Sequence, residues 1–527
     1  MVRKHKRTRA LRQPVTTGGG GYGWITAILI LAVLTALGRV IAHDFSWWDD
    51  PANLYENPRF NPPSLRGILY YWHRPYLDMY IPVTYTVWGA LAMLSYTATP
   101  NAAGAYLSPA VFHAASVVLH VLAALMAFRI LEKIIDGGWA ACAGALLFGL
   151  HPLQVEAVAW ASGLRDLLAG LLSLIAIWQY LTFAMDRHKA AAETGARTAN
   201  KRVRGFPWNA RYVIAITAYA LAMLSKPAVV VTVLMVALLD YCVVRRSAGQ
   251  VIKSLVPWLL LAAGCALLAT NIQPGYSAPA VPLWSRPIVA ADAVGFYVYK
   301  LVFPLWLGWN YGRTPQTVLS SNSVYVMASV PLLLIGAMWY LRRRARLIVV
   351  GSLLFVASLV PVLGLVQFDF HWLSTVAYRY LYLGMLGPAM ALAWGTSRLR
   401  GPGIACVCVY LAALGMLSSA QASRWRNQVA IWQQELHVNP ASWLAHNDHG
   451  NYLRGQGQSE AAAGHWREAI RLKNDYAEPR ASLGNYLLNH GRCREAVALL
   501  RQAIRLNELK AAIDVTPGVR DPFGGRE

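Results

Sequence analysis

Acidic and basic side chains recur at the ends of apolar segments of this chain, where they could perform acid–base and phosphate chemistry beside a membrane. Ionised groups near hydrocarbon are costly unless water, an opposite charge or a substrate compensates them. A carboxylate placed there can act as general base toward a hydroxyl, and Lys and Arg can hold a phosphate leaving group. The candidate catalytic carboxylates are Asp49, Asp50 and Glu156. The candidate groups for binding a substrate and the phosphate of a donor molecule are Arg74, His151, Arg165, Asp166, Lys226 and Arg379.

The composition predicts that these groups are carried by a polytopic membrane protein. The chain has 527 residues, of which 56% are hydrophobic and 14% are charged, and this is too apolar for a soluble protein of this size. The net charge of +23 would suggest nucleic acid in a soluble protein. Here, however, the Lys and Arg residues lie mainly between apolar spans, where they set orientation. No nucleic-acid partner is expected, and the six cysteines imply no disulfide framework.

Apolar windows of ~20 residues predict about eleven transmembrane helices. They cover residues 24–42, 108–131, 138–151, 164–184, 212–225, 228–244, 255–270, 324–341, 347–365, 380–396 and 402–420. The positive-inside rule places the N-terminus in the cytoplasm and the candidate residues on the outer face. Two long outer loops, 43–107 and 271–323, contain further apolar helices. The helix over 80–96 is expected to lie in the interface, and the helix over 288–307 to lie on the surface or to dip in and out.

The C-terminal part of the chain repeats itself. His449-Gly450-Asn451-Tyr452-Leu453 recurs as Leu483-Gly484-Asn485-Tyr486-Leu487, 34 residues later. This period and pattern are typical of tetratricopeptide repeats, which are pairs of antiparallel helices. The predicted domains are a basic cytoplasmic N-terminus (1–21), a transmembrane domain (22–421), a half repeat plus two repeats outside the cytoplasm (422–509) and a disordered tail (510–527).

Several candidate residues also have a structural interpretation. Asp49 or Asp50 could cap a helix before Pro51, and Trp47 and Trp48 could anchor the loop in the interface. The other structural roles are the end of a span for His151, a mutual pair for Arg165 and Asp166, and a snorkelling lysine for Lys226. A divalent metal held by Asp49, Asp50, His151 and Glu156 is an open alternative, but no ligand spacing demands one. No cofactor is therefore expected to be required.

Several motifs resemble those of membrane O-mannosyltransferase-like proteins that carry tetratricopeptide repeats. The most specific match is His151–Trp160, followed by Arg165-Asp166-Leu167-Leu168. The other matched stretches are Trp48–Asn53 with Asn57-Pro58, Tyr80–Thr84, Phe112-His113 with Leu119-His120, Leu224–Pro227 and Arg379–Leu383. The resemblance extends from about Phe45 to Leu506.

This resemblance implies a GT-C glycosyltransferase, a superfamily that takes sugar from a polyprenyl-phosphate donor on the non-cytoplasmic face. The catalytic Asp of the first loop in that family falls on Asp49 or Asp50. The expected reaction is an inverting displacement by a hydroxyl of a protein, glycan or lipid, with Lys226 and the arginines steadying the phosphate. The compact loops and short repeat tail suggest a bacterial inner membrane, with the repeats in the periplasm and a protein acceptor or assembly partner bound to them.

Two other functions compete with this interpretation. A non-catalytic scaffold that presents its repeats to envelope assembly partners would not need acids and cations on one outer face. A transporter would place charges near the middle of the membrane and would show duplicated halves. The charged residues here sit at the ends of spans, and no such duplication is apparent.

Overall fold

A computed structural model describes residues 23–100, 104–135, 137–193, 209–272, 281–366 and 368–515. Over these ranges the chain is helical, with isolated bridges but no sheet strand. The predicted basic N-terminus and most of the predicted disordered tail lie outside the described residues. The last helix, α22 (Cys493–Val515), continues into the segment that the sequence assigned to this tail.

All the predicted spans coincide with helical segments. These segments are α1 (Gly23–Leu37), α4 (Pro109–Ile134), α5 (Gly138–Leu150), α7 (Leu164–Glu193), α9 (Ala210–Met223), α10 (Thr232–Leu239), α11 (Ala248–Ile272), α14 (Ser323–Leu341), α15 (Arg346–Leu359), α16 (Leu386–Thr396) and α17 (Pro402–Ser423). Among the described residues, 7 helices are long and apolar enough to cross a membrane, or 8 if α5 and its bent continuation form one span. The prediction of a polytopic all-α membrane protein is therefore confirmed.

Small residues let the central helices pack with their backbones in contact. A Cβ atom added at Gly387 on α16 would meet the carbonyl oxygen of Gly351 on α15. In the same way, one added at Gly144 on α5 would meet the carbonyl oxygen of Ala389 on α16. Close approach at small residues is how helices associate where no hydrophobic effect drives them together. These contacts fix α5, α15 and α16 around the loops that carry the candidate residues.

The loops that the sequence assigns to the outer face, which we call the outer loops, contain short helices that pack on the ends of the spans. They are α2 (Leu65–His73), α3 (Pro82–Ser95), α6 (Val155–Ala159), α12 (Arg286–Val302) and α13 (Pro315–Ser320). The helix expected over 80–96 is α3, which begins at Pro82 because proline suits the first turn of a helix. The helix expected over 288–307 is α12, which ends at Val302 and packs closely on α14 at Gly295 and Met327.

Five helices follow the last span and form helical hairpins. They are α18 (Gln428–Val438), α19 (Trp443–Gly455), α20 (Ser459–Leu472), α21 (Ala477–Asn489) and α22. The turns after α19 and α21 both contain a left-handed glycine, Gly457 (φ 76°) and Gly491 (φ 75°), at the spacing of the sequence repeat. A second core forms between these hairpins around Trp466 and Leu483. The C-terminal helices thus pair as hairpins at the period of the sequence repeat, and their assignment as tetratricopeptide repeats stays a prediction.

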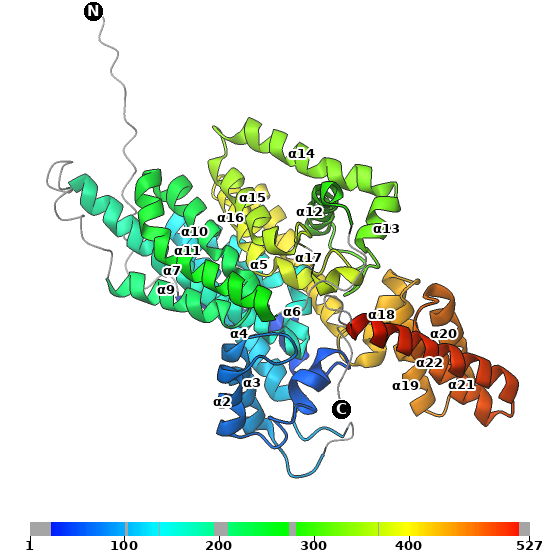
Figure 1. Ribbon diagram of the computed structural model, residues 1–527. Helices are drawn as coiled ribbons and strands as arrows, with labels where there is room; N and C mark the ends of the chain where they lie inside the picture. Colours follow the sequence, from blue (N-terminus) through cyan, green and yellow to red (C-terminus); the bar gives the residue numbers. More distant parts are fainter. Residues whose placement is uncertain are drawn as a thin grey trace, which may run out of the picture.

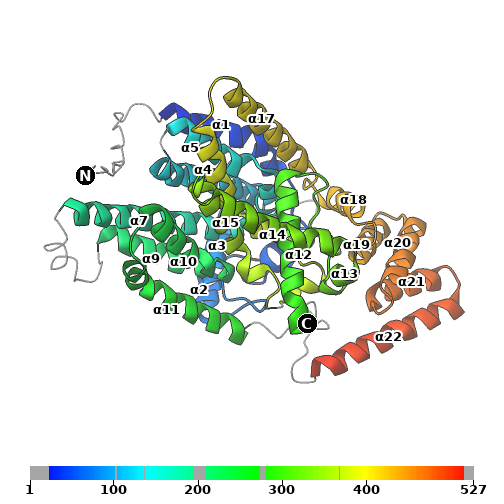
Figure 2. The same ribbon diagram turned by 90° about the horizontal axis from the view of Figure 1, so that it is seen from above.

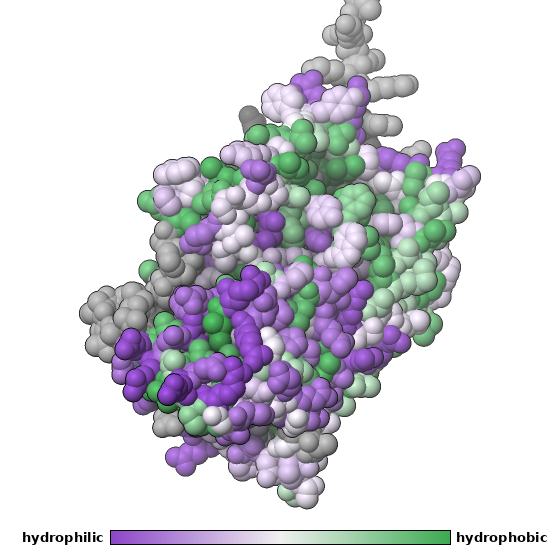
Figure 3. Space-filling view, turned by 90° about the vertical axis from the view of Figure 1, so that its right-hand side faces the viewer, coloured by the Kyte–Doolittle hydropathy of each residue, from purple (hydrophilic) through white to green (hydrophobic). Residues whose placement is uncertain are grey.

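The repeats lie on one side of the helical body. Figures 1 and 2 both show α18–α22 on the side opposite α7, α9 and α11. In Figure 3, hydrophilic side chains gather over the repeats, and hydrophobic ones cover much of the helical body behind them. The described part of the chain thus combines an apolar helical body with a polar helical appendage.

Candidate active site

Asp50 is an anchoring carboxylate. It is fully buried, and its Oδ2 accepts hydrogen bonds from the backbone N–H (2.8 Å) and the hydroxyl (2.9 Å) of Ser46. Its Oδ1 accepts from the backbone N–H (2.9 Å) and the hydroxyl (2.6 Å) of Ser162. Burial raises the pKa of Asp50 to about 6, although these four hydrogen bonds oppose the shift. With both oxygens occupied, Asp50 fastens the first outer loop to the loop before α7.

Asp49, its neighbour, is open to solvent. Its side chain is 42% exposed, and its Oδ2 lies 3.2 Å from Nη2 of Arg165. Arg165 is only 12% exposed and donates from Nη1 to the sulfur of Met79 at 3.7 Å. Asp49 is therefore an accessible carboxylate beside a mostly buried cation, and such a pair could serve as a base next to an anion-binding group.

Asp166 and Lys226 form a buried ion pair next to this site. Lys226 Nζ donates to Oδ1 of Asp166, and Arg165 Nε lies 3.9 Å from Oδ2 of the same carboxylate. Lys226 is in an extended conformation because Pro227 follows it and disfavours helix at the preceding residue. This break between α9 and α10 lets the ammonium group reach Asp166 in the first turn of α7. Burial lowers the pKa of Lys226, while Asp166 opposes that shift.

Glu156 and Arg379 make a second buried pair. Arg379 Nη1 lies 2.5 Å from Oε1 of Glu156, and the backbone N–H of Tyr378 donates to Oε2 at 3.0 Å. Glu156 lies on α6, and Arg379 lies in the 3₁₀ turn that precedes α16. Both carboxylate oxygens are thus occupied, and the pair joins the outer loop before α7 to the last outer loop.

The ring of Trp160 joins the two clusters. The guanidinium carbons of Arg165 and Arg379 lie 5.3 Å and 5.4 Å from the ring centroid. Such cation–π contacts hold both cations where the site loops meet. A small cavity of about 40 Å³ opens between Asp166, Lys226, Arg379 and Tyr380. The ring of Tyr380 also lies beneath the ammonium of Lys226, at 5.5 Å.

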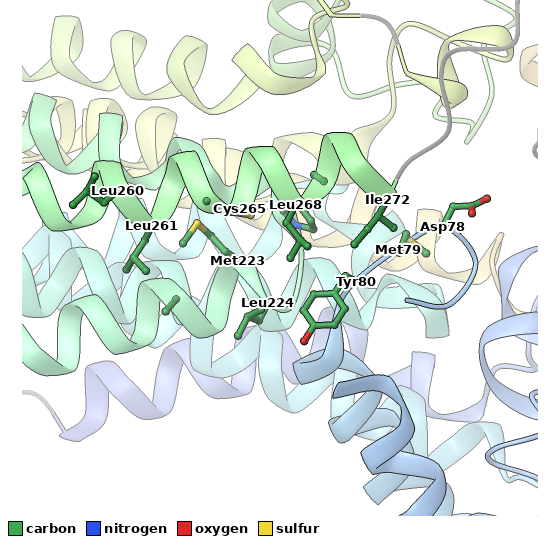
Figure 4. Close-up of a pocket in the computed structure, with 14 residues that line it drawn as sticks. Asp78, Met79, Tyr80, Met223, Leu224, Leu260, Leu261, Cys265, Leu268 and Ile272 are labelled. Carbon is green, nitrogen blue, oxygen red and sulfur yellow. The ribbon is translucent and has the colours of Figure 1, made fainter. Parts of the chain in front are cut away.

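An apolar groove of about 280 Å³ lies beside this region. Its walls come from α9 and α11, and residues 78–80 lie at one end of it (Figure 4). Met79 lines the groove and also receives the hydrogen bond from Arg165. Pro227, which is bonded covalently to Lys226, lines it as well. Two residues that line the groove are therefore neighbours of the cations: Met79 contacts Arg165, and Pro227 follows Lys226 in the chain.

Two predicted site residues, His151 and Arg74, do not join these ion pairs. His151 is fully buried; its Nδ1 accepts from the backbone N–H of Leu153, and its Nε2 lies 3.1 Å from the carbonyl oxygen of Leu301. It therefore fastens the end of α5 to α12 and is not directed at the cations. Arg74 is exposed at the end of α2 and forms no ion pair with another described residue. In the described part of the chain, no group of three His, Cys, Asp or Glu side chains has an arrangement that could hold a metal ion.

The structure also shows partners that sequence reasoning did not assign. Ser46 and Ser162 hold Asp50, Met79 contacts Arg165, and Tyr380 contacts Lys226. Two of these partners stand near predicted residues in the sequence, since Tyr380 lies within a matched motif and Ser162 lies four residues before Asp166. Ser46 lies four residues before Asp50 and Met79 lies 86 residues before Arg165, and neither stands within a matched motif.

Comparisons with known proteins extend the resemblance beyond short motifs. No family model matches the chain. A protein O-mannosyl-transferase of Caenorhabditis elegans, F38B6.6, is 22% identical over 70% of this chain and 51% of its own length. Human protein O-mannosyl-transferase TMTC1 is 24% identical over 69% of this chain and 46% of its own length. Mouse TMTC4 is 23% identical over 84% of this chain and 66% of its own length.

The resemblance to TMTC-type protein O-mannosyltransferases is thereby confirmed. The chain spans about half the length of the first two of these relatives. Among solved structures, ArnT from Cupriavidus metallidurans bound to undecaprenyl phosphate matches with a TM-score of 0.36 and 13% identity, over 94% of this chain and 80% of that one.

Proposed function

We propose that this protein is a membrane glycosyltransferase that moves a sugar from a polyprenyl-phosphate donor to a hydroxyl acceptor. The observation that carries the proposal is the exposed carboxylate of Asp49 paired with Arg165, next to the buried Asp166–Lys226 pair. The named activity of the relatives, protein O-mannosyl transfer, supports the same reaction class. The acceptor is the hydroxyl of a protein Ser or Thr, or of a glycan or lipid.

In this mechanism Asp49 removes the proton from the acceptor hydroxyl. The acceptor oxygen attacks the anomeric carbon of the sugar, and the bond from that carbon to the phosphate oxygen breaks. Arg165 and Lys226 stabilise the charge that develops on the leaving phosphate. A single displacement of this kind inverts the anomeric centre. Asp50 and Glu156 hold the loops in place, because their oxygens are occupied by Ser46, Ser162, Arg379 and Tyr378.

The apolar groove supplies a place for the lipid part of the donor. Its lining is mostly apolar and comes largely from α9 and α11, and Met79 and Pro227 also line it. A polyprenyl chain in this groove would bring its phosphate to the side of the protein where Arg165 and Lys226 lie. The proposed orientation places this surface in the periplasm, with the N-terminus in the cytoplasm and the protein in the inner membrane. The repeats over 422–509 would then recruit a protein acceptor or an assembly partner.

A transfer assay tests the proposal. Purified protein in detergent receives a panel of radiolabelled polyprenyl-phosphate sugars with host membrane and periplasmic extract, in the presence and absence of a chelator. Transfer to a macromolecule or lipid is expected with the wild type and Asp475→Asn, a variant at an exposed repeat carboxylate. Transfer is expected to be lost in Asp49→Asn, and the chelator is expected to have no effect.

The opposite result is equally clear. Absence of transfer from every donor, by folded protein that still captures partners through its repeats, would overturn the enzyme proposal in favour of a membrane scaffold. Full activity of folded Asp49→Asn would remove Asp49 from the proposed mechanism.

A further inference from the structure

The loop that carries Asp49 is held by the repeats as well as by the membrane domain. The backbone N–H of Asp44 donates to the carbonyl oxygen of Arg426 at 3.0 Å. The backbone N–H of Trp47 donates to Oε1 of Gln428 at 2.7 Å. Gln428 is the first residue of α18 and is buried. The segment immediately before Asp49 is therefore fastened to a helix nearly four hundred residues away in the sequence.

The side chain of Trp47 strengthens this attachment. Its ring lies against the rings of Trp432 on α18 (centroids 5.5 Å apart) and Tyr452 on α19 (5.8 Å apart). Trp432 is fully buried, whereas Trp47 keeps half of its surface exposed. Aromatic contacts of this kind add to the free energy of the hydrogen bond that the backbone makes. Trp47 is thus a contact with the repeats, which gives it a role other than anchoring the loop in the membrane interface.

The next residue, Trp48, connects the repeats to the cations of the site. Its ring centroid lies 3.7 Å from that of Trp309, 5.9 Å from that of Trp425 and 6.4 Å from that of Trp160. Trp160 in turn carries the guanidinium groups of Arg165 and Arg379 on its ring. Continuous contact therefore runs from Trp425, three residues before α18, to the groups that would hold the phosphate.

The helix α18 is itself fixed on the outer loop after α12. Gln434 donates from Nε2 to the carbonyl oxygen of Leu307 at 2.8 Å. Glu435 accepts from the backbone N–H of Asn310 at 3.3 Å and is fully buried. Since α18 is secured on this side, it can act as a rigid support for the loop that carries Asp49.

We propose that α18 is a positioning element of the active site, with Gln428 and Trp432 as positioning residues. Asp49 lies between two anchors: Asp50 is tied to Ser162 of the membrane domain, and Trp47 is tied to Gln428 of the repeats. Releasing one anchor leaves the carboxylate free to move relative to Arg165. The inference rests on the proposed function, because it assigns Asp49 the role of base. It predicts that contacts made by the repeats determine kcat, in addition to any recruitment of an acceptor.

The test compares two Gln→Met variants, which remove a hydrogen-bond acceptor at nearly constant size. Gln428→Met removes the acceptor for Trp47. The control, Gln502→Met, removes the acceptor for Arg480 within the repeats, away from the site. The first readout is hydrogen exchange of the peptide covering residues 44–50 in the full-length protein. Exchange is expected to be faster in Gln428→Met and unchanged in Gln502→Met.

The second readout is steady-state transfer. Gln428→Met is expected to lower kcat about ten-fold or more, because small displacements of a reacting group carry large rate penalties. The KM for the lipid donor is expected to stay within about two-fold, since the cations belong to other loops. Trp432→Ala is expected to behave in the same way, and Trp432→Phe to recover most of the rate. A merely structural role of α18 would not separate kcat from KM in this manner.

The outcomes separate the two proposals. Unchanged exchange of residues 44–50 in Gln428→Met overturns the positioning role whatever the activity. Active wild type with equal kcat in Gln428→Met and Gln502→Met overturns the positioning role alone. Inactive wild type overturns the proposed function and the positioning role together, even if exchange shows that Gln428 holds the loop.

Discussion

Asp49 and Asp50 are adjacent in the sequence, but their carboxylates lie in opposite environments. Asp50 is fully buried and accepts four hydrogen bonds from Ser46 and Ser162. Asp49 is 42% exposed and meets the guanidinium of Arg165. The sequence offered no means of choosing between the two acids. In the structure Asp50 fixes the loop, whereas the carboxylate of Asp49 is accessible, and the proposed mechanism therefore assigns the role of base to Asp49.

Substitution of each acid by Asn is therefore expected to have different effects. Asp49→Asn should abolish transfer and change stability little, because the Asp49 carboxylate is 42% exposed and Arg165 keeps Asp166 at 3.9 Å as a second partner. Asp50→Asn places an amide N–H₂ among four donors and should lower the free energy of unfolding by about 1–3 kcal/mol. Thermal unfolding in detergent and the transfer assay measure the two effects. A stable and inactive Asp50→Asn, next to an active Asp49→Asn, would reverse the assignment.

The buried pair of Asp166 and Lys226 gives a second prediction. Lys226→Met leaves the Asp166 carboxylate buried with only a distant contact to Arg165, and removal of one partner of a buried pair costs about 3–5 kcal/mol. The double variant Asp166→Asn/Lys226→Met should recover most of that stability. It should nevertheless stay inactive, because the cation that steadies the phosphate is gone.

A matched pair on the surface serves as the control for this experiment. Arg211 and Asp186 lie 3.6 Å apart, with both side chains about half exposed. Asp186→Asn/Arg211→Met should change stability by less than about 1 kcal/mol and leave transfer intact. If the Asp166→Asn/Lys226→Met protein were fully active, Lys226 would have a structural role only.

The sequence predicted the elements of this fold better than their contacts. Apolar runs of helical length located the spans, and the repeat period located the C-terminal hairpins, because both signals are local. Helices α10, α15 and α16 are shorter than the predicted spans, since 3₁₀ turns replace regular helix after Lys226, after Leu359 and before α16. A break of this kind changes only one or two residues of an apolar run, so the sequence does not show where regular helix stops.

The candidate site was predicted in part. Charged residues at span ends were identified by type, and Asp49, Arg165, Asp166 and Lys226 do lie together. The pairing of Glu156 with Arg379 joins residues more than two hundred positions apart, and no local pattern specifies it. The same holds for Trp47 and Gln428. His151 stands in the most specific motif, yet its ring bonds Leu153 and Leu301, which shows that a motif can mark a loop junction as well as a reacting group.

The apolar groove gives a third prediction, which concerns the donor lipid. Gly264 lines the groove on α11, and a Cβ atom added there meets nothing within 4 Å. Gly264→Leu should therefore fold and fill part of the groove. The KM for a long-chain polyprenyl-phosphate donor should rise several-fold, while that for a short-chain analogue should change little. Steady-state kinetics with the two donors measure the difference.

Gly249 provides the matched control on the same helix. A Cβ atom at Gly249 also meets nothing within 4 Å, but this residue does not line the groove. Gly249→Leu should leave both KM values unchanged. Equal effects of Gly264→Leu on long and short donors would argue that the lipid binds elsewhere.

The contact between α18 and the outer loop predicts a pH dependence of stability. Glu435 is fully buried, and burial raises its pKa from 4.5 to about 8. Between about pH 4.5 and 8, Glu435 is therefore protonated in the folded protein and ionised in the unfolded chain. Its contribution to stability is fully present below pH 4.5 and is lost as the pH rises through 8. Glu435→Gln, which is neutral at every pH, should lack this loss.

Thermal unfolding of full-length protein between pH 5 and pH 9 measures this effect as a difference between variants. The Tm of the wild type should fall relative to that of Glu435→Gln as the pH rises, because only the wild type must bury an ionising carboxylate. Glu508→Gln, at an exposed position of α22, is the control for the loss of one acidic group. Its Tm should change with pH in the same way as that of the wild type. Parallel curves for the wild type and Glu435→Gln would show that Glu435 titrates as an ordinary carboxylate. In that case α18 would be held on the outer loop through Gln434 and the aromatic contacts, with no dependence on the protonation of Glu435.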